Sequence, residues 1–150
     1  GLQVALYLSG ELPVSVQGWT EQPKGDPRFS EVFSTVKTEL HFPSGAVANL
    51  MTSYDADTLN MSNVYGEAGK LLMQPANGYA GNTLTLVRDG SSEVLTPGDS
   101  GVQFAQMCAH FADAIREGVA IRTPGEMGLR DIRLVDAIYR SAASGEPVNL

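Results

Sequence analysis

The sequence predicts an α+β fold in which a mainly antiparallel, open β-sheet has helices packed on one face. Between residues 31 and 96, short segments with period-two apolar alternation are joined by short turns, which favours antiparallel neighbours. Two segments with helical apolar spacing, 102–118 and 123–144, follow toward the C-terminal end. Strands followed by helices are typical of α+β domains, and 150 residues with 43% apolar content suffice for one core.

The first thirty residues predict a helix, a strand and a polar loop. Gly10 follows an apolar stripe at helical spacing and is a suitable residue to end a helix, whose beginning we expect to precede Gly1. After Pro13, residues 14–20 (VSVQGWT) favour a strand, and the polar stretch EQPKGDPR favours a loop. The apolar stripe of the predicted helix comprises Leu2, Val4, Ala5, Leu6 and Leu8.

Three hairpins are predicted next. In the first, the alternating segment 31–42 (EVFSTVKTELHF) turns at PSG into AVANLMTSY. In the second, EAG joins LNMSNVYG to KLLMQ. In the third, DGS joins TLTLVR to SEVLTP, and its Asp89–Gly90 pair is among the stronger short-range signals of a hairpin turn.

The two C-terminal helices are predicted to be amphipathic. Gly118 ends the first, and Thr123, Pro124 and Glu126 have the spacing of a capping box that begins the second, with Gly145 after its last turn. The apolar face of the first helix comprises Phe104, Met107, Cys108, Phe111 and Ile115. The predicted core face of the second comprises Met127, Ile132, Val135, Ile138, Tyr139 and Ala142. Exposed ion pairs are expected for Glu126 with Arg130 and for Asp136 with Arg140.

Composition excludes several classes of partner. The net charge is −7, from 17 acidic and 10 basic residues, and no basic run occurs, so neither a nucleic-acid partner nor a membrane surface is expected. Cys108 is the single cysteine, which rules out an internal disulfide and fits a reducing compartment; on the apolar helix face it is expected to be buried and inert. The predicted location is the cytoplasm, with the periplasm as the alternative.

The motifs that carry chemistry are sparse. Asp55 and Asp57, followed by Thr58, resemble the signature of haloacid-dehalogenase-type phosphatases, which would imply Mg²⁺-dependent hydrolysis. That signature belongs after the first strand of a parallel sheet, whereas here a hairpin precedes it, so a polar loop is the favoured interpretation. His41 and His110 lack further ligands at suitable spacing, so no metal site is predicted. No glycine-rich phosphate-binding motif is present.

The C-terminal third carries a resemblance to a known family. The stretch HFADAIREGVAIRTPGEMGLRDIRLVDAIYRSAASGEPVNL resembles the end of the glucose–fructose oxidoreductase/inositol dehydrogenase/MocA family, closest to the glucose–fructose oxidoreductase branch. Upstream, LHFPSGAVANLMTSY and VYGEAGKLLMQPANGY resemble the family's hairpin and the segment after it. The resemblance covers essentially all 150 residues and implies the family's glyceraldehyde-3-phosphate-dehydrogenase-like C-terminal domain.

The resemblance implies a two-domain enzyme that moves hydride between NAD(P) and a sugar or polyol. In the family an N-terminal Rossmann domain binds the cofactor, a Glu-Lys-Pro motif supplies a lysine near the hydride, and D-x-G-x-Y or D-x-x-x-H supplies the proton-transfer partner. This sequence has none of these motifs. We therefore expect residues 1–150 to be a single C-terminal substrate and oligomerisation domain, inactive alone, without cofactor-binding or catalytic residues, and with the Rossmann domain absent from this chain.

One residue is a candidate for the substrate side. Tyr79 lies in the glycine-rich stretch PANGYAGN and is predicted to contact a sugar-like molecule; the alternative is a tyrosine packed on the sheet edge. The predicted partners are the protein's own Rossmann domain and a second copy bound through the open sheet face. The alternative function is a stand-alone dimerisation or ligand-binding module without catalysis.

Overall fold

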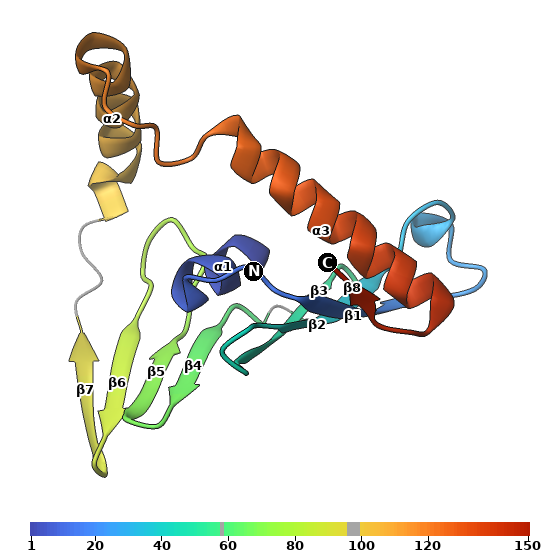
Figure 1. Ribbon diagram of the computed structural model, residues 1–150. Coiled ribbons are helices and arrows are strands. Elements are labelled where there is room, and N and C mark those ends of the chain that lie inside the picture. Colours follow the sequence, from blue (N-terminus) through green and yellow to red (C-terminus); the bar gives the residue numbers. More distant parts are fainter. Residues whose placement is uncertain (58, 96–99) are drawn as a thin grey trace. The chain divides into compact units, whose positions relative to one another are not determined.

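The computed structural model describes residues 1–57, 59–95 and 100–150, which fall into two compact units. Unit 1 consists of Gly1–Asp57 and Thr123–Leu150, and unit 2 consists of the residues between them. Each unit contains one four-stranded antiparallel sheet (Figure 1). The α+β class and the antiparallel pairing predicted from the sequence are therefore confirmed.

The sheet of unit 1 has the strand order β3-β2-β1-β8. The predicted first hairpin is confirmed, since the pairing of β2 with β3 ends with His41 opposite Val47 across the turn. The elements of unit 1 are α1 (Leu2–Ser9), β1 (Ser15–Glu21), the short 3-10 helix η1 (Pro27–Phe29), β2 (Thr35–His41), β3 (Val47–Ser53), α3 (Gly125–Ser144) and β8 (Val148–Asn149).

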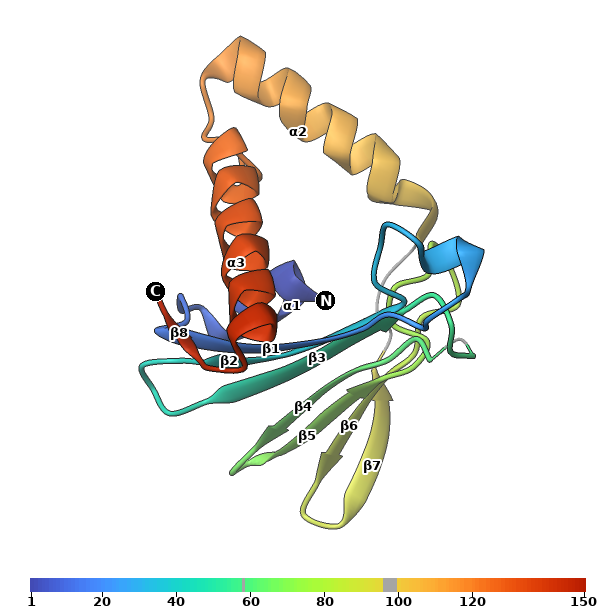
Figure 2. The same cartoon turned by 90° about the vertical axis from the view of Figure 1, so that its right-hand side faces the viewer.

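Helices α1 and α3 cover the same face of this sheet (Figure 2). Helix α3 approaches β1 at Gly18, where a side chain would overlap the backbone carbonyl of Ile138, so only glycine permits this packing distance. The fully buried Ser141 lies at the same contact. The core formed between helices and sheet comprises Leu6, Val16, Leu40, Phe42, Leu134, Ala137 and Ile138.

Helix α3 differs from the prediction in its start and in its buried face. Pro124, and not Thr123, is the N-cap residue, and no side chain caps the helix, so the predicted capping box does not form. The residues turned to the sheet are Leu134, Ala137, Ile138 and Ser141, while Ile132 and Tyr139 are 67% and 43% exposed. Small residues allow close approach to β1, and hydrophobic spacing alone does not reveal that preference.

The C-terminal end of α3 and one of its two expected ion pairs are as predicted. Gly145 ends the helix in the left-handed conformation, with φ of 77°, as predicted. The Asp136–Arg140 pair forms at 3.0 Å. The expected pairing of Arg130 with Glu126 is replaced by a 2.7 Å pair with the adjacent Asp131, which Gln3 of α1 also contacts.

The sheet of unit 2 has the order β4-β5-β6-β7, and both of its predicted hairpins are confirmed. Asp89 and Gly90 both have positive φ, 50° and 74°, as the predicted tight hairpin turn requires. Of the strand predicted at 92–97, Thr96 and Pro97 lie outside the described residues. The elements of unit 2 are β4 (Ser62–Gly66), β5 (Gly69–Met73), β6 (Leu84–Arg88), β7 (Ser91–Leu95), the 3-10 helix η2 (Ser100–Val102) and α2 (Gln103–Glu117).

Helix α2 has the predicted length but not the predicted burial. Gly118 ends it in the left-handed conformation, as expected. None of its residues is buried, and Cys108, predicted to be a buried thiol, is exposed. The apolar face was assigned correctly from its spacing, but an amphipathic pattern does not say which surface covers it. No helix in the described parts of the chain is long and apolar enough to cross a membrane.

Candidate functional site

The loop between β5 and β6 in unit 2 carries the predicted substrate residue and is held by side-chain amides. The strand pairing continues into it, since the N–H of Gln74 donates to the carbonyl of Thr83 at 3.0 Å. The Oδ1 atom of Asn60 accepts hydrogen bonds from the backbone N–H groups of Ala76 and Asn77, at 3.3 and 2.8 Å. It also accepts one from the side-chain amide of Asn77, at 3.0 Å.

A second clamp closes the tip of this loop. The side chain of Asn82 accepts from the N–H of Gly78 at 3.1 Å and donates to the carbonyl of the same residue at 2.9 Å. Ala76, at the base of the loop, is buried. Backbone groups that water would otherwise solvate are thus bound within the loop, and residues 79–81 lie between the two ends of the Asn82 clamp.

Tyr79 lies in this part of the loop and is 76% exposed. Its ring packs at a tilt against Phe104 of α2, with 5.6 Å between ring centroids. The side-chain amide of Gln103 donates to the Tyr79 carbonyl at 3.4 Å. Sequence reasoning selected Tyr79 but missed Phe104 and the Asn60 clamp, because these contacts join segments far apart in the chain. The role of Tyr79 stays a prediction.

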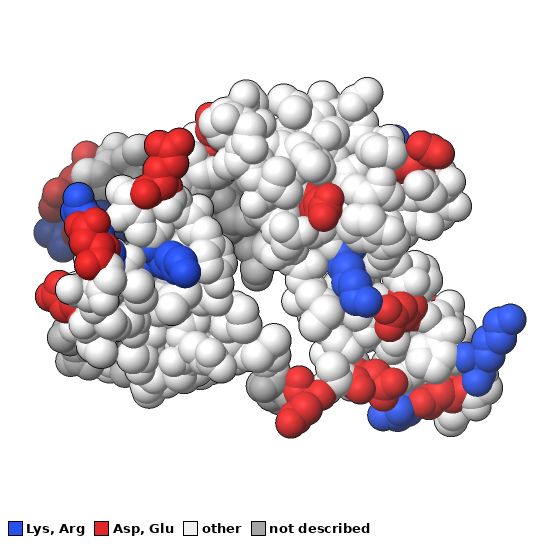
Figure 3. Space-filling view, turned by 90° about the horizontal axis from the view of Figure 1, so that it is seen from below, with Lys and Arg blue, Asp and Glu red and all other residues white. Residues whose placement is uncertain are grey.

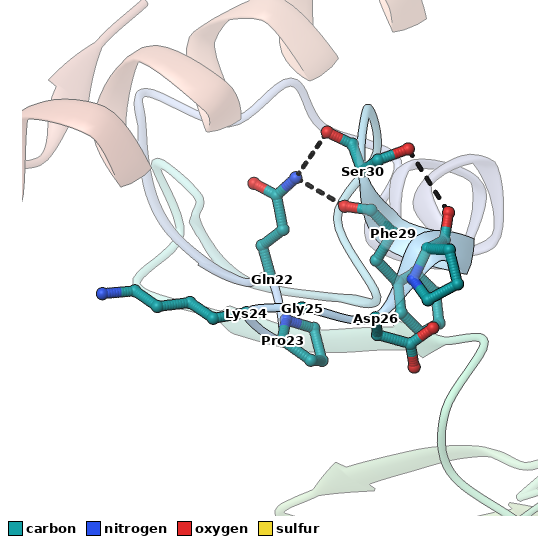
Figure 4. Close-up of a pocket in the computed structure, with 8 residues that line it drawn as sticks. Gln22, Pro23, Lys24, Gly25, Asp26, Phe29 and Ser30 are labelled. Atoms are coloured by element: carbon teal, nitrogen blue, oxygen red, sulfur yellow. Dashed lines mark hydrogen bonds between the residues drawn. The ribbon is translucent and has the colours of Figure 1, made fainter.

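A second loop, between β1 and β2 in unit 1, encloses a surface hollow of about 500 Å³ (Figure 4). Gln22 reaches across it and donates from Nε2 to the carbonyls of Phe29 and Ser30, at 2.6 and 3.4 Å. Phe29 is buried beneath the loop, whereas Lys24 extends outward. The side chain of Gln22 therefore crosses the hollow, and the buried ring of Phe29 anchors the loop.

An ionic cluster ties this loop to the end of β3. The guanidinium of Arg28 binds Asp26 at 2.7 Å and Asp55 at 3.0 Å. Hydrogen bonds from the Arg28 side chain and backbone N–H hold the pKa of Asp26 below its usual value, and the two carboxylates raise the pKa of Arg28. Both aspartates are at the surface.

The phosphatase interpretation finds no support in this arrangement. Asp55 follows an antiparallel strand at the edge of its sheet and binds Arg28. The parallel strand that such a nucleophile requires is not part of unit 1, in so far as the structure describes it. Thr58 lies outside the described residues, and Asp57 is engaged in an interaction of its own.

The histidines take structural roles. The Nε2 atom of His110 accepts a hydrogen bond from the N–H of Arg122 at 3.0 Å, which ties the chain after α2 back to the helix. His41 lies 3.5 Å from Glu39 on β2. Within residues 1–57, 59–95 and 100–150, no group of three potential ligands is placed to hold a metal ion.

Charged side chains form no continuous basic surface on the face shown in Figure 3. Acidic and basic residues are interspersed there among wide uncharged areas. This distribution offers no track for a nucleic-acid backbone on that face.

Comparison with known proteins places the chain in one family of oxidoreductases. Residues 1–150 match the family model described as the C-terminal alpha/beta domain of an oxidoreductase family, GFO_IDH_MocA. A curated D-xylose 1-dehydrogenase (NADP(+)) of Haloferax volcanii is 31% identical over 130 residues, which are 83% of this chain and 39% of that protein.

Solved structures agree with this match. The aldose-aldose oxidoreductase of Caulobacter crescentus, solved with glycerol, is 33% identical, with a TM-score of 0.90 over 99% of this chain and 44% of its own. An Agrobacterium radiobacter oxidoreductase, solved with NAD+, L-tartaric acid and magnesium, shares the fold at 20% identity and a TM-score of 0.76, over 99% of this chain and 46% of its own. The chain thus spans less than half the length of these relatives.

Proposed function

Since this chain belongs to the glucose–fructose oxidoreductase/inositol dehydrogenase/MocA family, as the C-terminal α/β domain of its oxidoreductases, we propose that it serves an NAD(P)-dependent enzyme acting on a sugar or polyol. Its part is to form one wall of the substrate pocket and to mediate oligomerisation. The Rossmann domain that binds the cofactor is a separate, N-terminal part of the protein.

The observation that carries this proposal is the agreement of two relatives with different names but related chemistry. At 31% and 33% identity, one is named as a D-xylose dehydrogenase and the other as an aldose-aldose oxidoreductase. Both names specify redox chemistry on an aldose. A stand-alone binding module is less well supported, because the family match and these relatives point to a part of an enzyme.

NAD(P) supplies hydride transfer when bound, and the expectation from the sequence is that another domain binds it. The sequence contains no G-x-G-x-x-G motif, the fingerprint that places a pyrophosphate at a helix N-terminus. We therefore assign the cofactor to the other domain. What this chain contributes is binding and orientation of the sugar.

Tyr79 is the residue we propose for that contact. Its exposed ring offers an aromatic face to a sugar, and the Asn60 and Asn82 clamps hold its loop in place before binding. A loop ordered in advance loses little freedom when the ligand arrives, which favours affinity. Pockets of this kind combine aromatic surface with a few fixed polar groups.

We propose the sheet of unit 2 as the surface for oligomerisation. Its strand register places aliphatic residues from all four strands on one face, and none of them is buried. A face of this kind in a water-soluble domain marks an interaction surface. The residues are Val64, Leu71, Met73, Leu84, Leu86 and Leu95.

The experiment that tests the function is an activity survey of the longer protein that carries this domain. Reduction of NAD+ and NADP+ is followed with a panel of aldoses, including D-xylose, and with the matching polyols. We expect turnover with at least one aldose or polyol and none from residues 1–150 alone. Absence of turnover with every sugar and both cofactors would refute the function, and turnover by the 150-residue chain would refute its inactivity.

A further inference from the structure

The loop that carries Tyr79 also contains Asn77 followed by Gly78, the single Asn-Gly pair of the sequence. The side-chain amide of an asparagine can be attacked by the backbone nitrogen of the next residue. Glycine in that position allows the attack most readily, because it has no side chain to obstruct the approach. Asn77 is exposed, so water reaches the pair. The loop thus contains a bond that is prone to deamidation next to the proposed substrate residue.

Deamidation exchanges the side-chain amide for a carboxylate, with water as the co-reactant. The nitrogen of Gly78 gives its proton to the solvent and bonds to Cγ of Asn77; the Cγ–Nδ2 bond breaks, and Nδ2 leaves as ammonia. Water then opens the resulting cyclic imide at either of its two carbonyls. Opening at Cγ gives aspartate in an unaltered backbone. Opening at the main-chain carbonyl gives isoaspartate, in which the backbone runs through Cγ and is longer by an atom.

Both reacting groups are bound by the clamps of this loop. The N–H of Gly78, which must lose its proton, donates to Oδ1 of Asn82 at 3.1 Å. The Nδ2 atom of Asn77 donates to Oδ1 of Asn60 at 3.0 Å, and the backbone N–H of Asn77 donates to the same oxygen at 2.8 Å. Ring closure needs the Gly78 nitrogen and the Asn77 side chain to be free at the same time, so it requires local opening of the loop.

We propose that Asn77–Gly78 is a deamidation site, that the Asn60 and Asn82 clamps keep it unreactive, and that its conversion releases the Tyr79 loop. Aspartate at this position has a carboxylate oxygen in place of the donor Nδ2, so it faces the acceptor Oδ1 of Asn60 with no hydrogen to share. Isoaspartate also displaces Gly78 from Asn82, because its backbone is longer. Either product therefore loosens the loop that we propose for the sugar.

The rate of deamidation in the longer protein that carries this domain tests the proposal. The protein is kept at mildly alkaline pH with and without urea, and conversion is followed by mass spectrometry of the tryptic peptide 71–88, whose fragments separate a change at Asn77 from one at Asn82. We expect conversion of Asn77 to be at least about tenfold slower in the folded protein than in urea, because only the opened loop reacts. Equal rates in the two states, or no conversion in urea, would overturn the proposal.

Variants of the clamp identify the groups that protect the site. Asn60→Ala removes the shared acceptor and should speed conversion in the folded protein about tenfold. Asn60→Asp keeps an acceptor oxygen at the same place and should convert at the wild-type rate. Asn63→Ala makes the same change as Asn60→Ala but on β4, outside the clamps, and should have no effect.

Hydrogen exchange of the β5 and β6 amides shows whether each variant keeps its sheet. If Asn60→Ala disturbs the sheet, Asn82→Ala replaces it, because it removes the other clamp, and the same acceleration is expected. A wild-type rate for a folded Asn60→Ala or Asn82→Ala variant would contradict the proposal. So would an Asn60→Asp variant that converts as fast as Asn60→Ala.

Release of the loop is measured in the variant Asn77→Asp, which has the charge of the product. Exchange of the amides of residues 76–78 should be about tenfold faster than in the wild type, because the Asn60 clamp no longer holds them. Unchanged exchange would show that conversion does not release the loop. None of these measurements uses enzymatic activity, so their outcome is independent of whether the proposed function is correct.

Discussion

Ser141 joins helix α3 to strand β1 through a buried hydroxyl, and its removal is a stringent test of how unit 1 is held together. The hydroxyl accepts a hydrogen bond from the N–H of Gly18 at 2.9 Å and donates to the carbonyl of Glu146 at 2.7 Å. Strand β8 pairs with β1 only as far as Val16, so the Gly18 N–H lies beyond the ladder on that side. Ser141→Ala leaves it without a partner.

The loss of folding free energy expected for Ser141→Ala follows from the burial of the two backbone groups that its hydroxyl binds. A buried N–H left without a partner costs about 1–3 kcal/mol, and about 2 kcal/mol is a reasonable value for the wholly buried contact at Gly18. The Glu146 carbonyl lies in an exposed residue and also accepts from the hydroxyl of Ser144 at 3.4 Å, so its lost bond is replaced by this group and by water. Alanine regains about 0.5 kcal/mol of helix propensity. The net loss is about 1.5 kcal/mol, equivalent to roughly 3–6 °C in Tm for a chain of this size.

The assay is thermal and urea unfolding followed by the fluorescence of Trp19, which adjoins Gly18 and reports on unit 1. Arg133→Ala is the control, because it also introduces alanine into α3 but at an exposed position, and we expect it to shift stability by no more than about 0.5 kcal/mol. If Ser141→Ala unfolds together with the control, the Gly18 N–H has no need of the hydroxyl and the reasoning is refuted.

Three further predictions concern the site and the surface. Tyr79→Ala should raise KM for the preferred aldose about tenfold with kcat nearly unchanged, while Tyr79→Phe keeps the ring and stays near wild type. A wild-type KM for Tyr79→Ala would remove Tyr79 from the pocket. Leu86→Lys should dissociate the oligomer in sedimentation experiments, and Thr85→Lys on the opposite face should not. Because Arg28 lowers the pKa of Asp26 below 3.8, the stabilisation it gives is complete above that pH and is lost as the pH falls toward the lowered value; Asp26→Asn should remove this acid dependence from NMR and unfolding titrations.

Local chemistry explains which parts of the fold could be predicted. The Asp89–Gly90 turn, and the glycines that end α1, α2 and α3, depend on backbone preferences within a few residues, and all were assigned correctly. The start of α3 was misplaced, although Thr123 and Glu126 have suitable spacing, because Pro124 takes the cap position. The spacing of Thr123 and Glu126 shows that a capping box is possible, but it does not determine at which residue the helix begins.

Tertiary contacts explain the parts of the fold and of the candidate site that the sequence did not predict. The buried face of α3 is set by the approach of the helix to Gly18, so the small residues Ala137 and Ser141 displace Ile132 from the core. Cys108 is exposed, as is most of α2, because helical spacing defines an apolar side of a helix but does not determine what packs on it. At the site, Tyr79 was selected from its loop, but its contact with Phe104 joins segments separated by two strands, which no local pattern encodes.

The distribution of buried residues separates stability from function along the chain. Among the described residues, the buried apolar side chains lie in unit 1, apart from Ala76, and no residue of helix α2 is buried. The Tyr79 loop and the apolar sheet face both belong to unit 2. Apolar patterns that are regular enough to form strands and a helix, yet remain uncovered, are expected where a domain is built to contact other surfaces. We therefore expect unit 1 to supply most of the stability, and we assign the surfaces proposed for the substrate and for a second copy to unit 2.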